Sequence, residues 1–205
     1  MPRPRWNHLD PEKQALIRQT TLQELGEFGV DGASYNRIIK KSGVSKGAMY
    51  YYFDDRNDLF HTALLHMVDE LIGSYPRPEH PPTHPEEFWV VARSVLRHGV
   101  HWFHAHPVEA KVVLQLGPTA RDSLPEKYRT PERQVAALFL QILALAQRIG
   151  AVRTDLPFPF LMELVLGVQR TCDRWLILHA NEPEGVLEEK ITLVLDILQR
   201  LVEPR

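Results

Sequence analysis

Apolar side chains recur along this chain at spacings of three and four residues, the period of an α-helix with one buried face. The first predicted helix has one such stripe, made of Ile17, Thr21, Leu25 and Phe28. Asp10 precedes it as an N-cap, and Gly29 supplies a left-handed residue that ends it. No convincing run alternates polar with apolar residues beside a hairpin turn, so the pattern predicts an all-α fold.

Two short helices are expected next, over 34–42 and 45–52, joined by a tight turn at Gly43-Val44. A longer helix opens at Asp55 and buries a stripe of apolar residues four and three apart: Phe60, Leu64, Met67 and Leu71. The first three helices therefore predict an N-terminal three-helix domain in which the second and third are very short.

A proline-rich stretch over 76–85 predicts a stiff loop, followed by a helix that Thr83 and Glu86 open as a capping box. Proline or threonine-proline signals then mark the starts of further helices. We expect about nine helices in total, the last two over roughly 157–180 and 184–202.

Composition describes an ordinary folded globule, with 44% hydrophobic and 24% charged residues. The formal net charge is −2, so affinity for nucleic acid has to come from a local patch. No apolar run approaches the ~18 residues of a membrane span, and no secretory signal follows Met1. A single cysteine, Cys172, cannot form an internal disulfide. We expect a cytoplasmic protein with no membrane partner.

Residues 34–53 form a locally basic stretch in a chain whose formal net charge is slightly negative. The stretch contains Arg37, Lys40, Lys41 and Lys46 and no acidic residue. Two short helices joined by a glycine-containing turn form a helix-turn-helix, whose second helix can enter the major groove of DNA. A basic surface hairpin without function is the alternative, but the clustered tyrosines at 50–52 favour a binding surface.

The sequence of this stretch also resembles a known family. Residues 43–53, Gly-Val-Ser-Lys-Gly-Ala-Met-Tyr-Tyr-Tyr-Phe, together with Gly29, Ser34, Ile38 and 56–59, resemble the N-terminal domain of TetR-family transcriptional regulators. The resemblance covers about the first quarter of the chain. The remainder agrees in helical pattern and length alone.

The resemblance implies a DNA-binding regulator, more often a repressor than an activator, that binds a pseudo-palindromic operator as a homodimer. It implies a helix-turn-helix DNA-binding domain over 1–60 and a ligand-binding and dimerisation domain over 61–205, where a small apolar or amphipathic effector changes DNA affinity. The basic stretch and the resemblance together give the expected DNA contacts: Ser34, Asn36, Arg37, Lys46, Gly47, Tyr50, Tyr51, Tyr52 and Arg56.

Two further features of this region stay open. Ile39 stands where the family usually has alanine, which changes how the two motif helices pack. Arg3 and Arg5 form a basic N-terminal arm that either reaches a neighbouring minor groove or remains a flexible tail.

The last two predicted helices have apolar residues on two sides, which predicts that both sides are covered. We expect one side to pack within the chain and the other on a second copy, as a four-helix dimer interface. A helix buried wholly within one monomer is the alternative. The expected interface residues are Leu166, Trp175, Ile177, Leu187, Ile191, Val194, Leu198 and Leu201.

An effector pocket is expected to be apolar with a few polar anchors. The candidate residues are Trp102, Phe103, Phe139, Met162, Gln169 and Trp175, each of which core packing also explains. A metal- or redox-responsive regulator of the same fold is an alternative, since His98, His101, His104 and His106 cluster in sequence. Ordinary surface histidines are the simpler interpretation.

Two other classes of protein are weighed against the regulator. The chain has no Gly-rich phosphate loop, nucleophile elbow or zinc-protease signature, so we expect neither an enzyme nor a cofactor. An interaction module that has lost DNA binding is the second alternative. The intact Lys46, Gly47 and Tyr50 argue against it.

Overall fold

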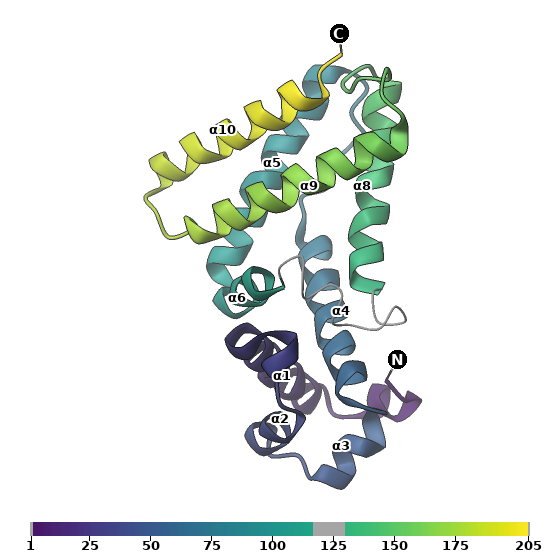
Figure 1. The fold of residues 1–205 in the computed structure, drawn as a ribbon, viewed down its shortest axis with the longest axis vertical. Coiled ribbons are helices and arrows are strands. Elements are labelled where there is room, and N and C mark those ends of the chain that lie inside the picture. Colours follow the sequence, from purple (N-terminus) through teal and green to yellow (C-terminus); the bar gives the residue numbers. More distant parts are fainter. Residues whose placement is uncertain (1, 117–129, 205) are drawn as a thin grey trace. The chain divides into compact units, whose positions relative to one another are not determined.

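The computed structural model describes residues 2–116 and 130–204, and over these ranges the chain forms helices and no strand (Figure 1). The all-α prediction is therefore confirmed. Within the same ranges, no helix is both long and apolar enough to cross a membrane. A short 3₁₀-helix, η1, spans Pro4–His8. The described residues form the α-helices α1 Pro11–Gly32, α2 Tyr35–Ser42, α3 Lys46–Tyr52, α4 Arg56–Ser74, α5 Pro85–Ala105, α6 Pro107–Gln115, α8 Thr130–Arg148, α9 Phe158–Leu178 and α10 Glu184–Val202.

The chain divides into two compact units, 1–72 with 106–133 and 73–105 with 134–205. The first unit holds α1–α3, most of α4, and α6, which returns to pack along α1. Gly26 permits this close approach, because a Cβ atom there would lie 3.1 Å from the Cβ of Lys111 and 3.4 Å from the Val108 carbonyl oxygen. The first unit thus contains more residues than the DNA-binding domain expected over 1–60. The boundary of the DNA-binding domain at residue 60 stays a prediction.

The core of the first unit follows the predicted pattern with one exception. Ile17, Thr21 and Leu25 are buried, but Phe28 is exposed. Its ring lies instead against a surface cation, with the guanidinium carbon of Arg37 4.3 Å from the ring centroid. Gly29 takes a positive φ of 66°, yet it kinks α1 rather than ending it, and the helix continues to Gly32. After this kink Val30 is buried, so the end of α1 still contributes to the core.

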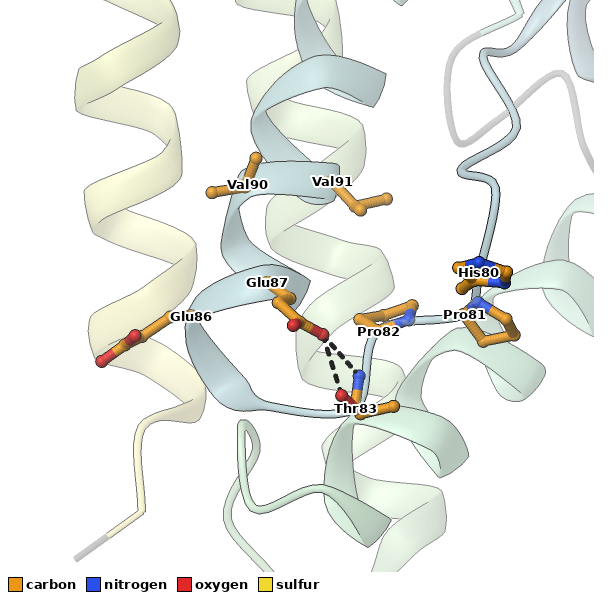
Figure 2. A pocket seen from close by; sticks show the side chains of 8 residues that line it. All are labelled: His80, Pro81, Pro82, Thr83, Glu86, Glu87, Val90 and Val91. Atoms are coloured by element: carbon orange, nitrogen blue, oxygen red, sulfur yellow. Dashed lines mark hydrogen bonds between the residues drawn. The ribbon is translucent and has the colours of Figure 1, made fainter.

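The start of α5 corrects the predicted capping box. Thr83 donates its backbone N–H and its hydroxyl to the Oε2 atom of Glu87, at 2.8 and 3.1 Å, and Glu86 takes no part (Figure 2). These hydrogen bonds lower the pKa of the Glu87 carboxyl. The same turn borders a surface hollow of about 700 Å³, lined by His80, Pro81, Pro82, Thr83, Glu86, Glu87, Val90 and Val91.

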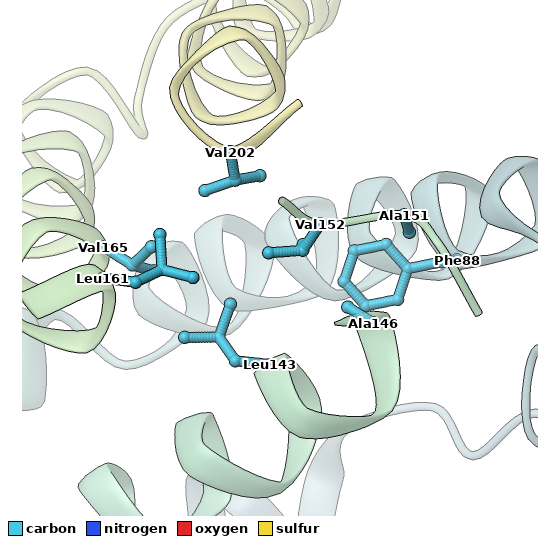
Figure 3. Packing of buried hydrophobic residues seen from close by; sticks show 8 residues of the cluster. All are labelled: Phe88, Leu143, Ala146, Ala151, Val152, Leu161, Val165 and Val202. Atoms are coloured by element: carbon cyan, nitrogen blue, oxygen red, sulfur yellow. The ribbon is translucent and has the colours of Figure 1, made fainter. Parts of the chain in front are cut away.

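The second unit buries two apolar clusters. The first, here called the α8 cluster, consists of Phe88, Leu143, Ala146, Ala151, Val152, Leu161, Val165 and Val202 (Figure 3). The second, the α10 cluster, consists of Val100, Cys172, Leu176, Ala180, Leu187, Ile191 and Val194. Both α9 and α10 contribute residues to each cluster, so each of these helices buries one face along most of its length within the unit.

Asp173 interrupts the apolar face of α9. Its Oδ1 atom accepts a hydrogen bond of 2.6 Å from the Gln169 side-chain amide. Burial raises the pKa of the Asp173 carboxyl to about 7, because the charged form loses hydration. Burial also raises the pKa of Tyr75 to about 12, and the charge of Asp173 adds to that shift. These two groups are a polar inclusion in a mainly apolar unit.

Asp173 makes stability depend on pH. Between the ordinary aspartate pKa of about 4 and the folded value of about 7, the unfolded chain ionises while the folded chain keeps its proton. The contribution of Asp173 to the free energy of unfolding therefore falls as pH rises through this range. We expect Asp173→Asn to gain about 2 kcal/mol over the wild type between pH 5 and pH 7.5 in urea unfolding. Asp196→Asn, at an exposed carboxylate, is the control, and a gain that does not change with pH contradicts the assignment.

Candidate DNA-binding surface

Local capping signals shape the helix-turn-helix. The Ser34 hydroxyl accepts the Arg37 backbone N–H at 3.4 Å and begins α2. Gly43 ends α2 in the left-handed conformation, with φ at 66°, where a side chain would be strained. The Ser45 hydroxyl accepts the Ala48 N–H at 3.2 Å and begins α3. These three residues confirm the predicted turn between two short helices.

One side of α3 is buried and the other is open. Met49 and the following Phe53 are fully buried, whereas Tyr50 and Tyr51 keep 44% and 45% of their surface exposed. The helix start is open as well: Gly47 is exposed, and a Cβ atom built there would meet nothing within 4 Å. The result is a short helix with an accessible N-terminal end and two accessible aromatic side chains.

Neighbouring aromatic rings support these tyrosines. Tyr35 on α2 meets Tyr50 edge to face, with centroids 5.3 Å apart, and Tyr51 meets Tyr52 in the same way at 5.5 Å. Burial raises the pKa of Tyr35. Tyr35 was absent from the predicted contacts. Its position at the start of α2 gave no signal of contact with α3.

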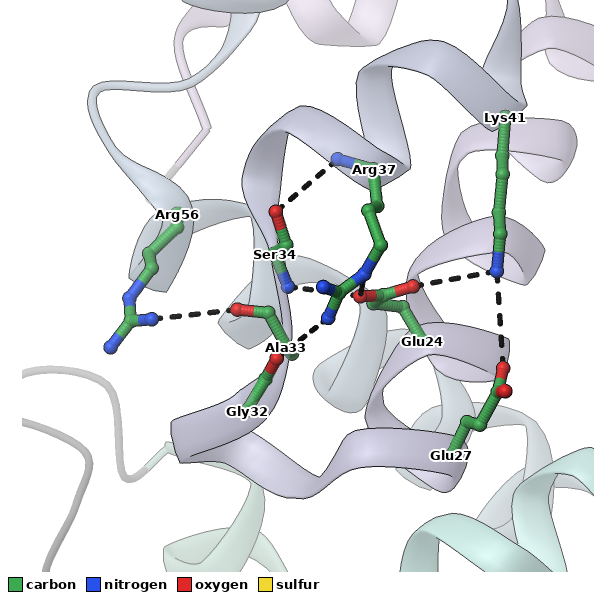
Figure 4. A network of polar contacts seen from close by, with 8 residues as sticks. All are labelled: Glu24, Glu27, Gly32, Ala33, Ser34, Arg37, Lys41 and Arg56. Atoms are coloured by element: carbon green, nitrogen blue, oxygen red, sulfur yellow. Dashed lines mark hydrogen bonds and ion pairs between the residues drawn. The ribbon is translucent and has the colours of Figure 1, made fainter.

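A buried carboxylate joins α1 to α2 (Figure 4). Glu24 is fully buried, and its Oε1 atom accepts the Ser34 backbone N–H at 3.0 Å and the Nε–H of Arg37. Its Oε2 atom lies 3.5 Å from the Nζ atom of Lys41, which also faces Glu27 at 3.9 Å. Arg37 donates a further hydrogen bond of 2.7 Å to the Gly32 carbonyl oxygen. Two cations of the basic stretch thus neutralise one buried acid.

The predicted DNA contacts differ in whether they bond to the chain itself and in how far they are exposed. Ser34, Arg37 and Arg56 bond to the chain itself, Arg56 through a 3.5 Å hydrogen bond to the Ala33 carbonyl oxygen. Asn36 is exposed on α2, and Tyr52 is partly buried. The remaining predicted contacts lie together on the open part of α3: Lys46, Gly47, Tyr50 and Tyr51.

The N-terminal arm is docked against α3, so the flexible-tail interpretation is wrong for η1. The Arg3 backbone N–H donates to the Tyr52 carbonyl oxygen at 2.9 Å, and the Arg3 side chain pairs with Asp54 at 2.8 Å. Trp6 is buried, with its ring centroid 4.8 Å from that of Phe53. The sequence signal for this docking was the single large apolar residue of the arm, Trp6.

The predicted effector residues are not brought to one cavity. Phe139 and Met162 pack on the α8 cluster, and Trp175 packs on the α10 cluster. Trp102 is buried beside Phe103, and Gln169 bonds to Asp173. None of these six residues lines the hollow at 80–91.

The exposed apolar side of α10 is not the predicted one. Leu187, Ile191 and Val194 are fully covered by their own chain, and Ile177 is also buried, which corrects the expected interface at these positions. Leu198 and Trp175 pack against the same α10 cluster, Leu201 packs against the α8 cluster, and Leu166 is partly buried. The exposed large apolar residues of these two helices are Phe160, Leu178, Val186, Leu193 and Ile197.

Two histidines of α5, His98 and His101, contact different partners. His98 lies 2.9 Å from the Ser74 hydroxyl, and His101 lies 3.4 Å from a carboxylate oxygen of Glu184. In the part of the chain that the structure describes, no three His, Cys, Asp or Glu side chains are grouped to hold a metal ion. Burial raises the pKa of the Cys172 thiol, which disfavours the reactive thiolate.

Comparison with known proteins finds similarity in the N-terminal part of the chain. Residues 17–63 match the sequence profile of the bacterial regulatory proteins of the tetR family. The uncharacterized HTH-type transcriptional regulator YvdT of Bacillus subtilis is 31% identical over 83 residues, 38% of this chain and 39% of YvdT. The HTH-type transcriptional regulator BetI of Proteus mirabilis is 42% identical over 59 residues, 29% of each chain. The chain thus aligns with well under half the length of these curated relatives.

Solved structures share the fold over nearly the whole chain. A TetR family transcriptional regulator from Chloroflexus aurantiacus superposes with a TM-score of 0.67 at 20% identity, covering 100% of both chains. The fatty acid degradation regulator FadR from Bacillus halodurans gives 0.68 at 16% identity, covering 93% of this chain and 96% of FadR. Residues 17–63, which contain the helix-turn-helix, are thus similar to the corresponding region of tetR-family regulatory proteins, and the chain shares the fold of a solved TetR-family structure.

The buried Glu24 provides a direct test of how α2 is held. Glu24→Ala removes the acceptor of one backbone N–H and the counter-charge of Arg37, and we expect a loss of about 2 kcal/mol in urea unfolding. Glu27→Ala removes only an exposed partner of Lys41, so we expect a change below about 0.5 kcal/mol. Equal effects of the two substitutions would contradict the role given to Glu24.

Proposed function

We propose that this protein is a transcriptional repressor that binds a pseudo-palindromic DNA operator as a homodimer and is released by a small apolar or amphipathic effector. The observation that supports DNA binding most strongly is the open face of α3, with Lys46, Gly47, Tyr50 and Tyr51 exposed together. This face lies within residues 17–63, which match the sequence profile of tetR-family regulatory proteins. Its chemistry matches what a reading helix needs in the major groove.

Each side chain of this face has a separate task in the proposal. Lys46 is the first residue of α3, and in this proposal it donates to the acceptor edge of a guanine. Gly47 adds no side chain there, so the helix start can approach the base edges closely. The hydroxyls of Tyr50 and Tyr51 can donate to phosphate oxygens, which fix the register of the helix on the duplex.

Dimerisation supplies the second reading helix. Two such helices have to be about 34–36 Å apart to enter successive major grooves on one side of B-DNA. We propose that the exposed apolar side of α10, with Leu193 and Ile197 at 51% and 43% exposure, packs on its counterpart in a second copy. Leu178 on α9 and Val186 at the start of α10 extend this surface.

The second unit is the proposed effector domain. Its support is the mixture of apolar side chains with a few enclosed polar groups that orient a small molecule. Asp173, with a pKa raised to about 7, and Gln169 are such groups on α9. An effector lowers the affinity of the protein for DNA only if it binds the DNA-free protein more tightly than the DNA-bound protein. The ratio of these two effector affinities sets the size of the change.

A titration of labelled genomic DNA fragments, followed by fluorescence anisotropy at several salt concentrations, tests the proposal. We expect a preferred sequence and a steep loss of affinity as salt rises, since phosphate contacts release counterions. Absence of binding at low salt would contradict DNA binding, and turnover of a small molecule by the chain would favour an enzyme instead.

Lys46→Ala separates base reading from general charge. We expect it to weaken operator binding by about 1–3 kcal/mol and to relax the preference at one base pair, because the lost donor distinguishes that base. Lys13→Ala removes an exposed lysine of α1 and serves as the control for charge. Binding to single-base operator variants measures the preference, and an unchanged preference contradicts the role of Lys46.

Tyr51→Phe tests a phosphate contact. Removing the hydroxyl while keeping the ring should weaken binding to all sequences by about the same factor, since a phosphate carries no sequence information. The same panel of operator variants measures this. A loss confined to one base pair would instead assign Tyr51 to base reading.

Leu193→Glu tests the dimer surface. A charge at the centre of an apolar interface is expected to shift the protein to a monomer in analytical ultracentrifugation and to reduce operator affinity at least tenfold. Val90→Glu places the same charge on an exposed apolar residue of α5, at 70% exposure, and should leave the dimer intact. A wild-type monomer, or a dimer unaffected by Leu193→Glu, overturns this surface.

A further inference from the structure

We propose that Arg5 and Tyr51 form one composite phosphate-binding site, which makes the docked N-terminal segment part of the DNA-binding surface. The inference rests on the proposed DNA binding by α3. It adds a residue outside the helix-turn-helix to that surface and replaces a minor-groove arm with a fixed contact to the backbone of the duplex.

The two side chains are already stacked. The guanidinium carbon of Arg5 lies 4.2 Å from the centroid of the Tyr51 ring. Both residues are exposed. A cation over an aromatic face is held by the ring's quadrupole, and a guanidinium has five N–H donors, more than the ring can engage. The stack therefore presents several charged donors beside the Tyr51 hydroxyl.

Arg5 forms no ion pair with a carboxylate among the described residues. Arg3, in contrast, pairs with Asp54, and Arg37 and Lys41 pair with Glu24. Its neighbour Arg3 offsets the negative charge of Asp54 at the end of α3. Arg5 is thus the cation of the arm that is available to a phosphate.

Anchors on both sides fix the backbone of Arg5. On one side, Arg3 donates its N–H to the Tyr52 carbonyl oxygen at 2.9 Å. On the other, Trp6 is buried, and the Gln14 side-chain amide donates to its carbonyl oxygen at 3.0 Å. A cation held in this way loses less conformational freedom on binding than one on a flexible arm.

The chemistry of the pair selects a phosphate diester of the DNA backbone. The planar guanidinium donates two parallel N–H bonds to phosphate oxygens, and a tyrosine hydroxyl adds a third donor. Tyr51 lies on α3, so the phosphate in question belongs to the strand beside the groove that α3 enters. Such a contact adds affinity for every sequence alike.

Operator affinity measured between 0.05 M and 0.2 M salt tests the site with Arg5→Ala, Arg5→Lys and the control Arg148→Ala, which removes an exposed cation at the end of α8. Arg5→Ala should weaken binding to all sequences. Two lost contacts per dimer lower the salt slope by about 1.8, so the loss at 0.05 M should exceed that at 0.2 M by about twelvefold. Arg5→Lys should keep the slope and bind with intermediate affinity.

Each other outcome has a definite meaning. If Arg5→Ala matches Arg148→Ala in affinity and slope while the wild type binds its operator, the composite site is wrong and the proposed function stands. If Arg5→Ala loses only a preference for A·T-rich flanks, the arm reads a minor groove and the phosphate site is also wrong. If the wild type binds no DNA at low salt, the proposed function fails first.

Discussion

The position of α2 depends on one buried charge. Glu24 lies inside α1 with no exposed surface, and an unpaired carboxylate there would cost several kcal/mol. It is matched by a backbone N–H at Ser34 and by the side chains of Arg37 and Lys41, all supplied by α2 or its cap. These partners fix α2 against α1, and the short turn at Gly43 then leaves α3 little freedom to sit elsewhere.

This constraint separates two kinds of basic residue that look alike in the sequence. Arg37 and Lys41 neutralise Glu24 and belong to the scaffold, whereas Lys46 and Arg5 are exposed beside the open face of α3. A rigid scaffold with a few free cations suits recognition of DNA, because contacts made from fixed positions lose little entropy on binding. The proposed function thus depends on which basic residues pair within the protein and which are exposed, rather than on the net charge of −2.

Local signals predicted the start of α1 at Asp10 and the turn at Gly43, since a cap depends on neighbours within four residues, but they misplaced the end of α1 at Gly29 and the acidic partner of Thr83. Contacts between distant residues were not predictable in this way. The pairing of Glu24 with Arg37, the docking of Trp6 and the burial of Ile191 all depend on tertiary packing. The side of α10 that contains Ile191 was predicted to be the dimer interface but is buried within the chain. The pattern could not distinguish the two sides, because both are apolar in sequence.

Chemical footprinting of guanine N7 on a bound operator tests the central claim, that α3 from each of two copies enters the major groove. Binding of this kind protects two clusters of guanines in the major groove, about one helical turn or 10–10.5 base pairs apart, on one side of the duplex. Protection of a single cluster, or protection confined to the adenine N3 positions of the minor groove, would contradict it.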